Sequence, residues 1–215
     1  NVSFEYKNAG AEALFDISFF AKPGQTVGII GGTGSGKSTL VNLVPNFYSA
    51  TKGQVLIDGV NADEYDRAAL LSAVSVVPQK AVLFEGTIRS NLLMGNPNAS
   101  EAELFSALET AQAAEIVRTK PNGIDEPVLR GGSNFSGGQK QRLSIARALV
   151  HGGRILILDD SASALDFATD AKLRAAIRKL SPAPTTFIVS QRAASVMFAA
   201  VSYTHLRAHE TLMNL

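Results

Sequence analysis

The residues best suited to chemistry form one short motif near the amino terminus. The motif follows the pattern GxxxxGK[ST] and consists of Gly31, Gly32, Thr33, Gly34, Ser35, Gly36, Lys37 and Ser38. Glycines let several backbone N–H groups approach phosphate oxygens, Lys37 adds a mobile charge near the β- and γ-phosphates, and the Ser38 hydroxyl suits Mg²⁺. A glycine-rich turn with a surface lysine is the alternative. The complete match, placed between an apolar strand and a helix, favours a phosphate-binding loop, which we extend to Thr39.

A carboxylate that could complete such a site follows the apolar run at residues 155–158. Asp159 would stand at the carboxyl end of a buried strand, where it can hold the water shell of a Mg²⁺ ion. Alone, the pattern describes equally well a core strand that ends in a capping aspartate. Beside a phosphate-binding loop, it predicts a site for a nucleoside triphosphate and Mg²⁺.

The composition is that of an ordinary globular chain. Of 215 residues, 46% are hydrophobic and 18% are charged, with a net charge of +1 and no cysteine. These values exclude intrinsic disorder, disulfides and Cys-ligated metals, and the charge balance argues against a nucleic-acid partner. No apolar run has the ~18 residues of a membrane-spanning helix. Because Asn1 already stands inside an alternating strand, we expect a piece of a longer protein.

Hydrophobic periodicity predicts an α/β fold with strands at both ends and helices in the middle. We expect strands at residues 2–6, 17–19, 26–30, 54–57, 74–77, 155–158 and 185–189, and helices at residues 100–117, 139–150 and 166–180. This order predicts an ATP-binding α/β core, residues 1–86 and 152–200, interrupted by a helical subdomain, residues 87–151.

The stretch from Asn134 to Gln139 resembles the signature sequence of ABC-type ATPases, and the order of motifs from Tyr6 to Gln191 agrees. As an isolated string, Ser-Gly-Gly would serve equally well as a linker. The resemblance implies a P-loop NTPase core sheet with an antiparallel β subdomain and an inserted α-helical signature subdomain. It also implies a head-to-tail pair of domains that holds each ATP between one chain's phosphate loop and its partner's signature, here Ser136, Gly137, Gly138 and Gln139.

Smaller landmarks of the family also have counterparts. Tyr6 occupies the place of the adenine-stacking aromatic, although a core tyrosine is the competing interpretation. Gln79 resembles the glutamine that contacts Mg²⁺ and the attacking water and senses the membrane domain. Asp166 resembles the D-loop aspartate, with a helix N-cap as its alternative. Residues 84–88 and Asn91 resemble the exporter branch, in which this segment leads toward the surface that receives coupling helices.

Three positions depart from the family pattern. Asp160 stands where the family places the glutamate that polarises the attacking water, Gln191 replaces the switch histidine, and Arg130 replaces a glutamate before the signature. Aspartate is one methylene shorter, and glutamine cannot carry the charge of an imidazolium. We therefore expect the chain's own site to bind ATP and hydrolyse it slowly, in a heterodimer whose other site is competent. A homodimer that tolerates both residues is the alternative.

These expectations describe the ATPase half of an exporter, at the cytoplasmic face of the membrane, with its transmembrane domain upstream of Asn1. A non-hydrolysing regulatory ATP-binding module is one alternative, and a soluble ABC ATPase that acts on DNA or ribosomes is another. The exporter-like segment from Phe84 to Asn91 weighs against the second alternative. The short separation of Ser38 and Ser136 weighs against its DNA-repair members only, because it leaves no room for their long coiled coil.

The carboxyl-terminal residues 201–215 are expected to be a non-native tail. Residues 196–215 contain no Gly, Pro or Asp, and residues 201–211 resemble a translated transposase adapter from library preparation. A genuine terminal helix is the alternative. We assign no metal or catalytic role to His205 or His209.

Overall fold

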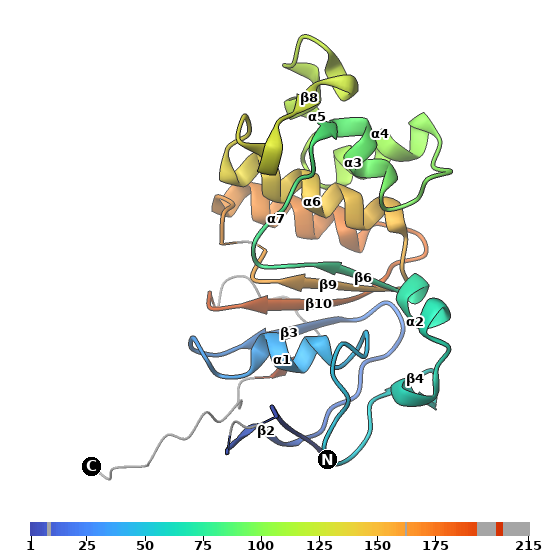
Figure 1. The fold of residues 1–215 in the computed structure, drawn as a ribbon, viewed down its shortest axis with the longest axis vertical. Coiled ribbons are helices and arrows are strands. Elements are labelled where there is room, and N and C mark those ends of the chain that lie inside the picture. The colour runs from blue at the N-terminus through green and yellow to red at the C-terminus, as the bar shows by residue number, and fades with distance from the viewer. Residues whose placement is uncertain (8–9, 162, 193–200, 204–215) are drawn as a thin grey trace, which may run out of the picture.

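A parallel five-stranded sheet forms the centre of the protein in the computed structural model, which describes residues 1–7, 10–161, 163–192 and 201–203 (Figure 1). The strand order is β11 (Val201–Tyr203), β3 (Thr26–Ile30), β10 (Thr185–Ser190), β9 (Ile155–Asp159) and β6 (Val74–Val77), and all four pairings are parallel. Strands buried on both faces need continuous apolar runs, as these sequences provide. The carboxyl ends of the strands therefore share one edge of the sheet.

Three small antiparallel pairs accompany the central sheet. β1 (Val2–Glu5) pairs with β2 (Glu12–Ile17), β4 (Leu56–Ile57) with β5 (Val60–Asn61), and β7 (Gly86–Thr87) with β8 (Pro127–Val128). The turn between β4 and β5 consists of Asp58 and Gly59, both with positive φ, at 52° and 82°. An Asp-Gly pair in this conformation makes the two-residue hairpin turn that suits strand twist.

Helices cover both sides of the sheet. They are α1 (Lys37–Asn42), α2 (Arg67–Ala73), α3 (Ile88–Leu93), α4 (Glu101–Thr110), α5 (Ala114–Arg118), α6 (Gly137–His151) and α7 (Phe167–Arg178), with short 3₁₀ turns at Ala62–Glu64, Gly123–Asp125 and Arg130–Gly132. In Figure 1, α1 lies on the opposite side of β6, β9 and β10 from α6 and α7. Among the described residues, no helix combines the length and apolarity needed to cross a membrane.

Two hydrophobic cores meet at the sheet. Alternate residues of β9 divide between them: Leu156 and Leu158 join the core around α6, whereas Ile157 joins the core around α1 and the β1–β2 pair. Because successive side chains of a strand point to opposite faces, a strand that is apolar at every position can close both cores at once. The sheet thus fixes the signature-bearing helix and the phosphate loop to one scaffold.

The predicted α/β class and the expected P-loop core with antiparallel strands and inserted helices are confirmed, and the strands at residues 26–30 and 74–77 match in full. The single helix predicted for residues 100–117 is wrong, because α4 ends at Thr110 and α5 begins at Ala114. Gln112 takes φ 57°, and the Ala113 N–H donates to Leu108 O at 2.7 Å. This is a Schellman ending, usually made by glycine, and Gln gives no sequence signal for it.

Two predicted strands are shorter than expected, since β1 ends at Glu5 and β4 begins only at Leu56. The strand predicted for residues 17–19 is displaced, because β2 runs from Glu12 and ends at Ile17. The predicted subdomain boundaries at residues 86–87 and 151–152 stay predictions. Gly86 lies on the core side of the boundary at residues 86–87, but in β7 it pairs with Val128 of β8, which belongs to the helical region. Of the predicted non-native tail, residues 204–215 lie outside the described residues, and Val201–Tyr203 form β11 beside β3.

Candidate functional site

Four of the predicted site segments lie at the carboxyl edge of the sheet because of the strand register. Val189 of β10 is paired with both Ile29 of β3 and Asp159 of β9. Ile29 and Asp159 are therefore at the same level in the sheet. β3 ends one residue later, at Ile30, and the phosphate loop begins there. Gln191 follows the end of β10, and Gln79 follows β6 by two residues. This edge is the usual place for ligands in open α/β sheets.

The phosphate loop, residues 31–36, has a backbone that requires glycine. Gly34 and Gly36 have φ of 79° and 85°, and a Cβ on Gly36 would lie 2.7 Å from the Ala13 carbonyl oxygen. On Gly31 it would lie 2.5 Å from Ser35 Oγ. Gly36, which the motif specifies, is therefore required by both its positive φ and its close approach to Ala13, and Gly34 at a variable position of the motif is favoured by its positive φ.

Lys37 is folded into the loop. Its Nζ donates to the carbonyl oxygens of Gly31 and Gly32 at 2.8 and 2.5 Å and lies 3.4 Å from Ser35 Oγ, and the residue is only 8% exposed. In these contacts the ammonium is held by neutral carbonyl and hydroxyl groups. A positive charge held in this way is suited to attract phosphate oxygens.

Ser38 and Asp159 come together from positions 121 residues apart. Ser38 Oγ donates to Asp159 Oδ1 at 3.0 Å. Burial raises the pKa of the Asp159 carboxyl above its ordinary value and the charge of Asp160 adds to the rise, whereas the Ser38 hydrogen bond and Lys37 oppose it. A buried carboxylate beside a hydroxyl is a pair of oxygen ligands that fits Mg²⁺, which is bound through one or two carboxylates with water and substrate phosphates.

Asp160 is positioned by its backbone and contacts Gln79. Its φ is 44°, its N–H donates to Val189 O at 3.0 Å, and the hydroxyl of Ser163 donates to its carbonyl oxygen at 2.8 Å. Gln79 Nε2 donates to Asp160 Oδ2 at 3.1 Å. Two of the three predicted catalytic residues are therefore in direct contact.

Gln191, the third predicted catalytic residue, is exposed just beyond β10. The next residue, Arg192, donates to the carbonyl oxygens of Leu165 and Ser163 at 3.4 and 3.3 Å. The end of β10 is thus linked to the segment that carries the predicted D-loop.

Tyr6 lies just past β1 and is not part of the core. Its hydroxyl forms a hydrogen bond of 2.8 Å with Thr39 Oγ1, and 38% of the residue is exposed. The edges of Phe4 and Tyr48 pack against it. Phe4, at 5% exposure, is the core aromatic of this strand, so the ring of Tyr6 has surface left to receive a flat ligand.

The signature residues begin α6. Ser136 caps the helix by accepting from the Gln139 N–H, and Gln139 Oε1 accepts from the Ser136 N–H, which completes a capping box. A Cβ on Gly138 would lie 3.1 Å from the Ala164 carbonyl oxygen. Since α6 and α1 lie on opposite sides of the sheet (Figure 1), one chain does not bring its signature to its own phosphate loop.

Asp166 is the N-cap of α7. Its Oδ1 accepts from the Thr169 N–H at 2.9 Å and its Oδ2 accepts from the Thr169 hydroxyl at 2.7 Å. These hydrogen bonds lower the pKa of the Asp166 carboxyl, the backbone one most. The N-cap alternative therefore describes the contacts of this residue, and the predicted ATP contact of Asp166 stays a prediction.

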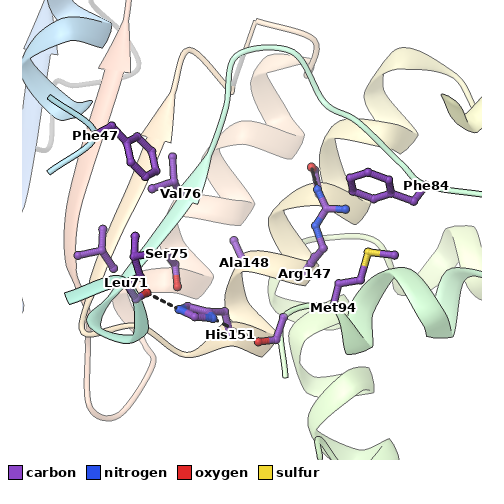
Figure 2. A pocket seen from close by; sticks show the side chains of 12 residues that line it. Phe47, Leu71, Ser75, Val76, Phe84, Met94, Arg147, Ala148 and His151 are labelled. Carbon is purple, nitrogen blue, oxygen red and sulfur yellow. Dashed lines mark hydrogen bonds between the residues drawn. The ribbon is translucent and has the colours of Figure 1, made fainter. Parts of the chain in front are cut away.

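A groove of about 280 Å³ lies between the sheet and the helical region, away from the phosphate loop (Figure 2). Phe47, Phe84 and Met94 give it an apolar wall. Arg147 of α6 donates to Val82 O at 3.0 Å, lies 5.5 Å from the Phe84 ring, and has a pKa lowered by burial. Only the exporter-like segment at Phe84 pointed to this surface from sequence, since the other residues converge through folding.

His151 closes the far end of the groove. Its Nε2 lies 3.1 Å from Leu71 O and its Nδ1 lies 3.2 Å from Gly95 O, as Figure 2 shows for the Leu71 contact. The ring thus links α2 of the core with the end of α3 in the helical region.

Comparison with known proteins identifies the family. The family model "ABC transporter" matches residues 14–163. An uncharacterized ABC transporter ATP-binding protein of Mycobacterium tuberculosis is 46% identical over 193 residues, which cover 88% of this chain and 33% of that protein. A beta-(1→2)glucan export ATP-binding/permease protein of Bartonella bacilliformis is 42% identical over 196 residues, or 91% of this chain and 33% of that protein.

A solved structure has the same fold. The structure of a bacterial Atm1-family ABC exporter with ATP bound superposes with a TM-score of 0.89 and 35% identity, over 95% of this chain and 36% of that one. The chain thus spans about a third of the length of the relatives it matches. From the family model, the relatives and the shared fold, we conclude that this chain belongs to the ABC transporter family, as an ATP-binding domain of the exporter type.

Proposed function

We propose that the chain binds ATP with Mg²⁺ at the site built on its phosphate loop and couples that ATP to membrane export. The supporting observation is the convergence of Lys37, Ser38 and Asp159 at one edge of the sheet, with Ser38 and Asp159 3.0 Å apart. In this site Mg²⁺ would neutralise phosphate charge, Ser38 and Asp159 would hold it, and Lys37 would bind the β- and γ-phosphates.

Lys37→Ala tests this site. We expect ATP affinity, measured by calorimetry with Mg²⁺, to fall about 10- to 100-fold, because a charge-assisted contact to phosphate is removed. Lys22→Ala, at an exposed lysine, is the matched control and should bind as the unmodified chain does. Unchanged ATP affinity in the Lys37 variant would refute the site.

We infer that hydrolysis at this site is slow. Asp160 stands where the family has the longer glutamate, and its carboxylate already accepts from Gln79. Gln191 is neutral where the family has a switch histidine. General-base catalysis contributes about 10²- to 10⁴-fold to the rate of such a reaction. A displaced base would therefore slow hydrolysis, and ATP would stay bound for longer.

We further propose that two such domains close head to tail, and that the partner domain belongs to a different subunit. The positions of α1 and α6 on opposite sides of the sheet support this arrangement, because a second domain is needed to bring a signature to the phosphate loop (Figure 1). The exposed Ser136 would then complete the partner's ATP site.

The two sites can be ranked in the full transporter complex. Ser136→Ala removes this chain's contribution to the partner's site, and Asp160→Glu with Gln191→His restores the family residues at its own site. We expect Ser136→Ala to remove most ATP turnover and the double substitution to change it much less. The opposite ranking would support a homodimer in which this chain's own site does the work.

The groove between the two regions is proposed to receive the transmembrane part of the protein, at the cytoplasmic face of the membrane. Phe84 and Met94 are half exposed on its rim, an apolar surface that needs a partner. The names of the relatives, which include permease, support such a partner. Met94→Asp should lower turnover in the complex and leave ATP binding by the 215-residue chain unchanged.

A non-hydrolysing regulatory module is the second candidate, favoured by Asp160 and Gln191 together. Single-turnover hydrolysis decides between the two candidates. Slow but measurable cleavage of bound ATP with the partner present supports the exporter ATPase, and none at this site supports the regulatory module.

A further inference from the structure

Three aromatic rings and one hydroxyl surround the proposed base site. Phe4 and Tyr6 meet edge to face with centroids 4.8 Å apart, and Tyr48 lies 5.4 Å from each of them. The Tyr6 hydroxyl is bound to Thr39, which directly follows Ser38 in α1. Tyr48 is 41% exposed, which is unusual for a ring that packs only to fill a core.

We propose that Tyr48 is a positioning residue for the nucleotide base: it holds the Tyr6 ring at the angle at which a purine can stack on it. The proposal rests on the proposed function, in which Tyr6 receives the adenine of ATP. Tyr6 lies one residue beyond the end of β1, so strand pairing does not fix its side chain. The ring contacts with Phe4 and Tyr48 and the hydrogen bond to Thr39 do so instead.

The backbone that carries Tyr48 is itself anchored. Asn46 has φ 54°, and its Nδ2 donates to Ala62 O at 3.2 Å, while its Oδ1 accepts from the Ser49 hydroxyl at 3.3 Å. The segment after α1 is thereby attached to the β4–β5 side of the core. Tyr48 is therefore a fixed support, and not a mobile surface ring.

The contacts of Tyr6 with Tyr48 and with Thr39 have different consequences. Tyr48 sets the tilt of the ring, whereas Thr39 sets its distance from the helix that carries Lys37 and Ser38. Base and triphosphate are covalently joined in one ligand, so a platform held at the correct distance from the phosphate loop adds base affinity to phosphate affinity. Loss of the Tyr48 support should weaken binding of a ligand with a base and spare a ligand without one.

The experiment compares ATP with inorganic tripolyphosphate, each with Mg²⁺, by calorimetry on the 215-residue chain. For Tyr48→Ala we expect ATP affinity to fall about 3- to 10-fold, the worth of an aromatic pair, with tripolyphosphate affinity unchanged. Tyr48→Phe should keep ATP affinity, because the ring is retained. Phe20→Ala, at a ring that is 74% exposed, is the matched control and should leave the affinity for both ligands unchanged.

Equal losses for both ligands would overturn the proposal, since Tyr48 would then support the fold and not the base. Unchanged ATP affinity in Tyr48→Ala would overturn it as well. Tyr6→Ala separates this failure from failure of the proposed function. If Tyr6→Ala lowers ATP affinity and Tyr48→Ala does not, only the positioning role of Tyr48 fails. If Tyr6→Ala has no effect, the base site itself is wrong.

A double-mutant cycle tests the second support. Tyr6→Phe and Thr39→Val each delete one partner of the 2.8 Å hydrogen bond. Each single variant should lower ATP affinity about 2- to 10-fold. The double variant should lose no more affinity than a single variant does. Additive losses would show that the two hydroxyls act separately, which contradicts a shared support.

Discussion

The buried carboxylate of Asp159 should lower the unfolding free energy of the ligand-free protein. The substitution Asp159→Asn measures the size of this effect. The carboxyl is 9% exposed, and burial raises its pKa above the ordinary 3.8. A raised pKa means that the folded state holds the proton more tightly than the unfolded state does. The wild-type chain therefore loses stability as the pH rises from about 3.8 through the raised folded pKa, and carries the full penalty above that range.

The size of the effect follows from what the asparagine keeps and loses. Its amide oxygen can still accept from the Ser38 hydroxyl, so the 3.0 Å hydrogen bond survives. It loses attraction to Lys37 and repulsion from Asp160, which oppose each other, and it no longer desolvates a charge. We expect a gain of about 1 kcal/mol in unfolding free energy at neutral pH. For a chain of this size that is about 2–4 °C in Tm.

Thermal melting followed by circular dichroism measures this gain without ligand and with saturating Mg²⁺ and ATP. Without ligand, Asp159→Asn should melt above wild type at pH 7, and the difference should narrow at acid pH. With ligand at about 100 Kd, wild type should gain about 2.7 kcal/mol and the variant less, because the variant lacks the carboxylate for Mg²⁺. Asp63→Asn, at an exposed carboxylate, is the control and should change stability by less than about 0.5 kcal/mol. A ligand-free variant that melts at or below wild type would refute the argument.

Four further predictions concern stability and assembly. Asn91→Ala should destabilise the chain by about 1–3 kcal/mol in urea unfolding, because its buried amide holds the Phe84 N–H and two carbonyl oxygens, at 2.8 to 2.9 Å. Ser100→Ala should cost about 1 kcal/mol in the same assay, through loss of the α4 capping box. Gln112→Gly should raise the unfolding free energy by about 0.5–1 kcal/mol, because glycine takes φ 57° without a Cβ clash. The 215-residue chain at low micromolar concentration should be monomeric in light scattering and hydrolyse ATP poorly, because in the proposed head-to-tail arrangement one chain offers half of each composite site.

Sequence predicted best what is determined locally. The phosphate loop and the strand before it follow from a motif whose glycines have no alternative and from an apolar run that only a buried strand uses. The placement of Asp159 opposite Ser38 also follows, because parallel strands end at one edge. The break at Gln112 was not predictable, since the Schellman hydrogen bonds that hold it are common to many sequences.

Contacts between distant segments escaped sequence reasoning for a different reason. Tyr48 touches Tyr6 across 42 positions, and Arg147 reaches the Val82 carbonyl across 65. Tyr48 belongs to no recognised motif, and Arg147, although it follows the signature sequence, gives no sequence signal for its contact with Val82. Both contacts exist only after the sheet has formed. Tyr6 itself was identified by resemblance, but its bond to Thr39 was not.

The same folding connects the groove with the chemistry. Gln79 donates to Asp160 at one end of a short segment, and Val82 and Phe84 are held by Arg147 at the other. Arg147 and His151 lie one turn apart on α6, so one side of the groove belongs to the helix that Ser136 begins (Figure 2). We therefore expect a partner that shifts Phe84 to act on the Gln79 amide or on the signature helix. Because the Asp160 backbone is fixed by Val189 and Ser163, the Gln79 contact is the part of the site that can yield. In the proposed function Asp160 is the base, so its contact with Gln79 joins the two residues, and we expect a change at position 160 to affect coupling as well as rate.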